Sequence, residues 1–310
     1  MPLAVTIRSG MIESLHSGSA VVLDPRGAVV AAWGDVSSPL LPRSAVKPLQ
    51  LHAMLGAGLD LPGDLLALVT ASHGGQPRHI SGVQQILGRH GLSEADLDNT
   101  PDWPLTPSLR HRAIAAGEPP RPLLQNCSGK HAGMLATCTV NGWPVAGYRA
   151  PEHPVQLAIR GGIARLTGGD VTAMAVDGCG APAPALSLTA LAKAFGDLAR
   201  GADGTPGHRI SASIRHHPGM VGGDGRDITA FLEAVPSAIA KDGAEAVWAA
   251  ALPDGQAVAV KIGDGGERAV APVLTRLLAL MGVSSPALDA FADRPVLGHG
   301  SPVGRIEPAF

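Results

Sequence analysis

The sequence predicts an α+β protein, in which both ends of the chain build one antiparallel sheet around an inserted helical lobe. Short apolar runs bounded by turn residues, typical of strands, occur in residues 3–34 and again in residues 246–262. Apolar residues at helical spacing dominate the segment between them. We therefore expect a single catalytic unit over residues 1–310, with a sheet lobe of about residues 1–40 and 240–300 and a helix-rich middle of about residues 41–239.

The composition excludes several classes of protein. A hydrophobic fraction of 45% over 310 residues fits a globular chain and argues against disorder. The 24 Lys and Arg residues nearly balance 26 Asp and Glu residues without a basic run, so we expect no nucleic-acid partner. No apolar stretch approaches the roughly 20 residues that span a bilayer, and the N-terminus lacks the basic region of a signal peptide. We therefore expect no membrane association and a cytoplasmic location.

The expected strands begin with a hairpin, in which residues 19–23 and 28–33 flank an Asp-Pro-Arg-Gly turn. A buried strand is expected at residues 171–176, and two more at residues 246–251 and 258–262. Helical spacing predicts helices at residues 47–55, 79–90, 128–140, 154–166, 186–200, 227–234 and 268–281. Residues 65–71 fit either a helix or a buried strand. Residues 98–125 contain six prolines and predict a long, ordered surface excursion.

Ser44-x-x-Lys47 is the first segment that carries chemistry. Residues three apart on one helical turn share a face, so the Lys47 amine could take the proton of Ser44 and make it a nucleophile. The spacing is common, and Ser44 could equally be a helix cap with Lys47 in solvent. In a helix that starts at Ser44, Pro48 would cost a backbone hydrogen bond unless the first turn is irregular.

Two further segments contain candidate site residues. Ser72-His73 is followed by two glycines, which suits either a second hydroxyl and oxyanion donors or a simple turn. Lys261 ends an expected strand, a position from which a lysine can face a nucleophile in Ser–Lys acyl-transfer enzymes.

Residues 126–134 (Asn-Cys-Ser-Gly-Lys-His-Ala-Gly-Met) form the densest cluster of reactive side chains. The cluster lies at an expected helix start, where free N–H groups stabilise a thiolate or a bound anion. The spacing of a phosphate-binding loop is not met.

The three cysteines do not describe a disulfide framework. Cys127 and Cys179 both lie in tight, polar loop settings and could meet, in a disulfide or in a soft metal site. Cys138 lies about 16 Å further along the helix from Cys127 and is expected in the core.

Four segments together resemble the L-asparaginase II family, the Rhizobium-type or class 3 asparaginases. They are residues 43–50 (Arg-Ser-Ala-Val-Lys-Pro-Leu-Gln), 71–73 (Ala-Ser-His), 126–134 and 177–180 (Asp-Gly-Cys-Gly). The resemblance extends from near residue 3 to about residue 282. It implies a fold similar to serine β-lactamases and glutaminases, a homodimer, and hydrolysis of L-asparagine to aspartate and ammonia.

The family pattern also implies roles for individual residues. It implies two Ser–Lys pairs, Ser44 with Lys47 and Ser72 with Lys261. It implies zinc bound by Cys127, Lys130 and Cys179, and it implies substrate contacts by Arg43, His73, Asp177 and His131, the last two also supporting the metal. The sequence departs from the pattern at Gly223-Asp224, where Gly-Thr is expected, and within residues 241–246, where Ala replaces Gly.

We therefore predict an L-asparaginase that works through an acyl-enzyme, with Ser44 as the nucleophile and Lys47 as its base. Ser72 with Lys261 is either the competing nucleophile pair or a proton relay, and zinc would orient the substrate rather than generate hydroxide. Two other classes remain open: another Ser–Lys acyl hydrolase such as a β-lactamase, peptidase or glutaminase, and a non-catalytic protein that binds an amino acid or a metal. The sequence leaves the preference for asparagine or glutamine undecided.

Overall fold

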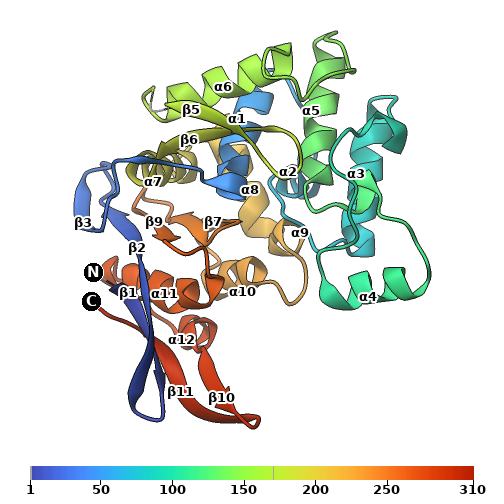
Figure 1. Ribbon diagram of the computed structural model, residues 1–310. Helices are drawn as coiled ribbons and strands as arrows, with labels where there is room; N and C mark the ends of the chain where they lie inside the picture. Colours follow the sequence, from blue (N-terminus) through green and yellow to red (C-terminus); the bar gives the residue numbers. More distant parts are fainter. Residues whose placement is uncertain (1, 170) are drawn as a thin grey trace. The chain divides into compact units, whose positions relative to one another are not determined.

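The structure, a computed structural model, describes residues 2–169 and 171–310. The chain divides into two compact units, drawn together in Figure 1. Unit 1 consists of Met1–Ala45, Leu186–Arg200 and Ala230–Phe310, and unit 2 consists of Val46–Ala185 and Gly201–Thr229. The predicted α+β class and the sheet built from both chain ends are confirmed.

Unit 1 contains an antiparallel sheet with the strand order β10-β11-β1-β2-β9-β8-β7, and β3 pairs with β2. The first strand of the chain lies between β2 and the last strand, so the two ends of the chain pair directly (Figure 1). The strands are β1 (Pro2–Arg8), β2 (Met11–Leu23), β3 (Val29–Trp33), β7 (Ile239–Gly243), β8 (Val247–Ala251), β9 (Ala257–Ile262), β10 (Pro295–Gly298) and β11 (Ser301–Pro308).

The long strand β2 holds this sheet together, because its first half pairs with β1 and its second half with β3 and β9. Gly18 lies where the pairing changes, and a Cβ at this position would come within 2.1 Å of the Lys261 carbonyl oxygen. Only glycine allows this approach, which fixes the register at the C-terminal end of β9, next to Lys261.

Helices cover both faces of the central strands in unit 1. Every residue of β8 is buried, as expected for a strand that is covered on both sides. Helix α7 (Leu188–Ala199) packs against β2, β8 and β9, whereas α11 (Val270–Leu280) packs against β1, β9 and β11. Helix α12 (Pro286–Ala292) packs on α11.

Unit 2 is a helical assembly around α5, whose residues from Ser128 to Cys138 are all buried. Gly133 allows the close approach of α2, since a Cβ there would lie 2.9 Å from a methyl group of Val69. The helices are α1 (Lys47–Gly56), α2 (Gly63–Val69), α3 (Pro77–Arg89), α4 (Pro107–Ala115), α5 (Ser128–Val140), α6 (Pro154–Leu166), α8 (Pro206–His216) and α9 (Pro218–Val221). Helix α10 (Asp227–Ala234) begins in unit 2 and ends in unit 1.

Several expectations about local structure need correction. The strand expected at residues 171–176 is β5 (Ala173–Val176), and it is exposed rather than buried, with Val176 78% exposed. It pairs with β6 (Pro182–Ser187), which the sequence did not predict because two prolines disfavour a strand. Residues 65–71 belong largely to helix α2, and the excursion at residues 98–125 contains α4.

We predict opposite effects on stability for two adjacent glycines of α6. A Cβ at Gly162 would lie 2.4 Å from the Cβ of Ala53 in α1, so Gly162→Ala forces the two helices apart and should cost about 1–3 kcal/mol of unfolding free energy. Gly161→Ala meets only the flexible end of Arg165, at 3.5 Å, and should stabilise the helix by about 0.5–1 kcal/mol. Urea unfolding of both variants measures the difference, and equal effects would contradict the close packing of α1 on α6.

Candidate active site

Lys47 begins helix α1, and its side chain is buried with 1% exposure. A 3₁₀ turn, η1 (Arg43–Val46), precedes it, so the helix starts late and Pro48 falls in the first turn. Proline is tolerated there because its missing N–H would have no partner in the helix. The irregular first turn that Pro48 requires is therefore present.

The amine of Lys47 bonds to the segment that follows α2. Its Nζ donates to the backbone carbonyl of Ala71 at 2.5 Å and to Ser72 Oγ at 3.2 Å. The structure thus brings Lys47 together with Ser72, a contact that the sequence did not predict. A hydroxyl bonded to a buried amine is suited to nucleophilic acyl transfer or to passing a proton.

Backbone hydrogen bonds hold the segment from Ser72 to Gly74 on two sides. The N–H groups of Ser72 and Gly74 donate to the carbonyls of Val221 and Gly222, and His73 N–H donates to Asn126 O. The segment is therefore tied to the loop after α9 and to the residues just before α5. These bonds fix the backbone that carries the Ser72 hydroxyl.

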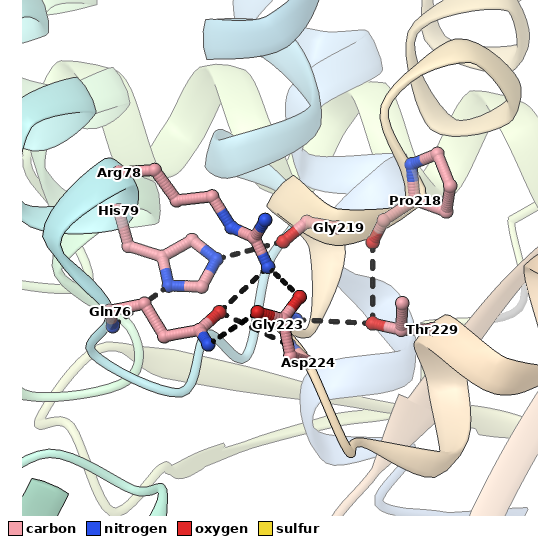
Figure 2. Close-up of polar contacts among 8 residues, drawn as sticks. All are labelled: Gln76, Arg78, His79, Pro218, Gly219, Gly223, Asp224 and Thr229. Atoms are coloured by element: carbon pink, nitrogen blue, oxygen red, sulfur yellow. Dashed lines mark hydrogen bonds and ion pairs between the residues drawn. The ribbon is translucent and has the colours of Figure 1, made fainter.

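Polar side chains reinforce the contact with the loop after α9 (Figure 2). Gln76 Nε2 donates to Asp224 Oδ2 at 2.9 Å, and Gln76 Oε1 accepts from Asp224 N–H at 3.1 Å. Arg78 donates to the carboxylate of Asp224, and this hydrogen bond holds the pKa of Asp224 below its usual value. His79 donates from Nε2 to Gly219 O at 2.9 Å. We name Gln76, Arg78 and Asp224 the loop clamp.

The start of α5 brings two thiols and an amine together. Cys127, which caps the helix, and Cys179, in the β5–β6 turn, lie in one buried cluster with Ala181. Lys130 Nζ donates to Cys179 Sγ at 3.0 Å, and all three side chains are at most 4% exposed. Cys127 and Cys179 do lie together, as free cysteines and not in a disulfide, while Cys138 lies buried within α5.

The charges in this cluster shift its proton affinities. A hydrogen bond from Cys179 lowers the pKa of Cys127 well below that of an ordinary thiol, helped by the charges of Lys47 and Lys130. The same hydrogen bond and burial raise the pKa of Cys179. Burial alone would lower the pKa of Lys130, but its hydrogen bond to Cys179 and the negative charges of Cys127 and Asp177 outweigh burial and raise the pKa.

The donor chemistry of the cluster fits zinc. Zinc prefers sulfur and nitrogen ligands, and the two thiols with the Lys130 amine supply three such donors in a dry place. Across residues 2–169 and 171–310, no group of three or more His, Cys, Asp or Glu side chains could hold a metal ion. The lysine is therefore the third donor on which a metal site here depends, and it would have to release its proton first.

Asp177 lies in the β5–β6 turn two residues before Cys179. Its N–H donates to Ala181 O at 2.9 Å and its carbonyl accepts from Gly180 N–H at 2.8 Å, which closes the turn. Gly180 has φ +83°, a conformation that glycine adopts without strain. The tight turn presents the Cys179 thiol to the start of α5.

His73 and His131 are both fully buried within unit 2. His73 Nε2 bonds to Ser128 Oγ at 2.8 Å, and its ring stacks on His79. His131 Nδ1 bonds to the hydroxyl of Tyr148 at 2.7 Å. Burial lowers the pKa of both imidazoles well below the usual value, and the charge of Lys47 contributes in each case.

Arg43, Ser44 and Lys261 lie in unit 1. Arg43 has φ +52°, an unusual backbone conformation for a residue with a side chain, directly before the half-buried Ser44. Lys261 Nζ donates to the carbonyls of Glu245 and Ile262, and partial burial lowers its pKa. The roles of these three residues beside Lys47 and Ser72 remain predictions.

Sequence reasoning missed the residues that support the cluster. Tyr148 is the only tyrosine of the chain, yet nothing in its local sequence marks it as a partner of His131. Gln76 and Asp224 are equally inconspicuous in the sequence. The one signal is at Asp224, where the family pattern has Thr. These partners become visible only when segments distant in sequence are brought together.

Comparisons with known proteins extend this description. The family model for L-asparaginase II matches residues 4–308. Similar solved structures include a β-lactamase from Mycobacterium bovis (15% identity, TM-score 0.44), with 81% of this chain and 88% of that chain covered. Another is a protein titled Mglu (14% identity, TM-score 0.36), with 86% of this chain and 66% of that chain covered. Values this low support no statement about activity. No curated protein sequence matches the chain.

The family match spans nearly the whole chain and makes the protein an amidohydrolase. More particularly, the chain belongs to the L-asparaginase II family. The match continues to residue 308, well beyond the point near residue 282 where the sequence resemblance ended. In the part of the chain that the structure describes, no helix is long and apolar enough to cross a membrane.

We predict that His73 makes stability depend on pH. Burial lowers its pKa in the folded state, so as pH falls below about 6.5 the unfolded chain takes up a proton first and stability decreases. The unfolding free energy should fall by up to about 1.4 kcal/mol per pH unit through this histidine alone. Urea unfolding between about pH 7 and pH 5 should give a shallower slope for His73→Gln.

His111→Gln, at an exposed position in α4, is the matched control and should keep the slope of the wild type. An unchanged slope in His73→Gln would contradict a neutral, buried imidazole at this position.

Proposed function

We propose that the protein is an L-asparaginase that hydrolyses the side-chain amide of L-asparagine through a Ser–Lys acyl-enzyme. The observation that carries the proposal is the buried Lys47 amine bonded to the Ser72 hydroxyl, in a chain of the L-asparaginase II family. An amine acts as a base in its neutral form, and a buried amine within hydrogen-bond reach of a hydroxyl is placed to exchange a proton with it.

The two hydrogen bonds of the Lys47 amine leave one position on its nitrogen. Ala71 O and Ser72 Oγ accept from Nζ, and in a neutral amine the third position is the lone pair. Ser44, three residues earlier in sequence, is the preferred nucleophile, and its proton would pass to this lone pair.

In the proposed reaction, Ser44 Oγ attacks the amide carbon and its proton passes to Lys47. The C–N bond then breaks, and the leaving nitrogen takes the proton to depart as ammonia. Water attacks the acyl-enzyme, gives a proton to Lys47 and releases aspartate as Ser44 regains its hydrogen. Backbone N–H groups near Ser44 or Ser72 would stabilise the oxyanion.

Ser72 has two proposed roles. Its hydrogen bond to Lys47 supports a proton relay between the base and the reacting groups. As a competing nucleophile it would use Lys261, whose lowered pKa favours a neutral amine. The pairing of Ser72 with Lys261 rests on the family pattern.

We further propose that Cys127, Lys130 and Cys179 hold zinc, with Asp177 and His131 as supporting groups. Bound zinc would supply a Lewis acid that orients polar groups of the substrate. The residues of the chain support this by their burial and by the two thiols and one amine that meet at the start of α5. Arg43, His73, Asp177 and His131 are proposed to contact the substrate.

Three wider properties are also proposed, of which the homodimer rests on the family resemblance. We propose that the two compact units act as one catalytic unit, that the chain forms a homodimer, and that it works in the cytoplasm.

Ammonia release from L-asparagine tests the proposed mechanism. Ser44→Ala and Lys47→Met should each lower kcat by about 10²–10⁴-fold, because the nucleophile or its base is lost. Lys193→Met removes an exposed lysine of α7 and should keep the activity of the wild type. Full activity in Ser44→Ala would move the nucleophile to Ser72, which Ser72→Ala then tests. Release from glutamine or a β-lactam, but not from asparagine, would replace the proposed substrate.

Metal analysis of the purified protein and of three cysteine variants tests the zinc site. The wild type should retain about one zinc ion per chain at neutral pH, because two thiolates and an amine bind zinc tightly. Cys127→Ala and Cys179→Ala should each lose the metal, whereas Cys138→Ala, in the core of α5, should retain it. Equal zinc content in all three variants would rule out this site.

A further inference from the structure

Tyr148 connects a loop to the histidine at the start of α5. Its phenol is buried, with the residue 1% exposed, and its oxygen accepts the backbone N–H of Asp98 at 3.1 Å. The same oxygen lies 2.7 Å from His131 Nδ1. All three residues belong to unit 2.

Counting protons assigns the direction of the second hydrogen bond. The Asp98 N–H can only donate, so the Tyr148 oxygen accepts there and keeps its single proton for another acceptor. Within the described residues, His131 Nδ1 is the partner available to that proton. A proton on Nδ1 would leave the buried phenol O–H without an acceptor, at a cost of about 1–3 kcal/mol. The favoured tautomer of His131 therefore carries its proton on Nε2.

The packing around Tyr148 keeps this geometry in place. Its backbone carbonyl accepts from the buried Gln156 side chain at 2.9 Å. Its ring meets the His131 ring edge to face, with centroids 5.6 Å apart. Burial raises the pKa of the phenol, so the O–H donor persists at all working pH values.

The opposite nitrogen of His131 is buried and has no hydrogen-bond partner among residues 2–169 and 171–310. A buried N–H without a partner is costly, so such a group is retained where a ligand will accept from it. His131 follows Lys130 directly and lies within the electrostatic reach of Lys130 and Lys47.

We propose that Tyr148 is a positioning residue, which fixes His131 as the Nε2–H tautomer so that this N–H donates to an oxygen of the bound substrate. The acceptor is a carboxylate or amide oxygen, both of which L-asparagine offers. The identity of the substrate rests on the proposed function, whereas the tautomer does not.

Nitrogen-15 NMR of protein with labelled histidine tests the tautomer without any assay of activity. The His131 signals, identified by their loss in His131→Gln, should show a protonated Nε2 and an unprotonated Nδ1. In Tyr148→Phe the donor to Nδ1 is gone, and the Nδ1 resonance should shift as the two tautomers mix. A wild type protonated on Nδ1, or a spectrum unchanged in Tyr148→Phe, would overturn the proposal.

Kinetics then separate positioning from a merely structural role. Tyr148→Phe should raise KM for asparagine by about tenfold with a smaller change in kcat, because a misdirected donor weakens binding in the ground and transition states alike. His131→Gln keeps an N–H near the Nε2 position and should retain more activity than His131→Asn. Asp98→Asn keeps the backbone N–H and serves as the matched control, with kinetics and His131 signals of the wild type.

A lower melting temperature in Tyr148→Phe with the KM of the wild type would refute the positioning role. A wild type that releases no ammonia from asparagine would overturn the proposed function instead, and the NMR result would still decide the tautomer.

Discussion

The buried amine of Lys47 is the constraint on which the architecture of unit 2 depends. An amine can be buried only if its donors find acceptors, and the two it finds belong to Ala71 and Ser72, just after α2. These two hydrogen bonds require a fixed separation between the start of α1 and the end of α2. They also require that the segment after Ser72 stays in place. Backbone bonds to Val221, Gly222 and Asn126 supply that rigidity, and the loop clamp adds side-chain bonds to it.

The second buried amine has a different environment and a different chemistry. Lys130 faces the Cys179 thiol rather than a hydroxyl and a carbonyl, and nearby negative charge raises its pKa. With its proton in place this lysine is a counter-ion for a thiolate, and as a zinc ligand it would have to release that proton. The two lysines of unit 2 thus differ in their neighbours: Lys47 bonds to a carbonyl and a hydroxyl, and Lys130 bonds to a thiol.

The sequence could predict what local periodicity determines. The bounds of α5, α6 and α10 match the expected helices, and the meeting of Cys127 with Cys179 follows from their polar turn settings. The hydrogen bond from Lys47 to Ser72 could not be predicted, because the spacing of Ser44-x-x-Lys47 predicts contacts only between residues on one helical turn. Strand β6 could not be predicted because its prolines disfavour a strand, and the local sequence of Tyr148 does not indicate its role. The strand and the Tyr148 hydrogen bond both form through tertiary contacts.

Backbone strain in unit 1 lies close to Ser44 in the sequence. Among the described residues, five with side chains have positive φ: Ser9, Arg43, Glu245, Ala246 and His299. Ser9 and His299 each precede a glycine in a two-residue hairpin turn, where such values are normal. Glu245 and Ala246 lie in the hairpin turn between β7 and β8, so among these five residues Arg43 alone lies outside such a turn. Arg43 precedes Ser44, and Glu245 with Ala246 forms the turn whose carbonyl accepts from Lys261. Each such conformation costs about 1–3 kcal/mol and persists only where the surrounding structure enforces it. Among these positions, the strain at Arg43, directly before Ser44, is the kind of local strain that gathers at functional sites.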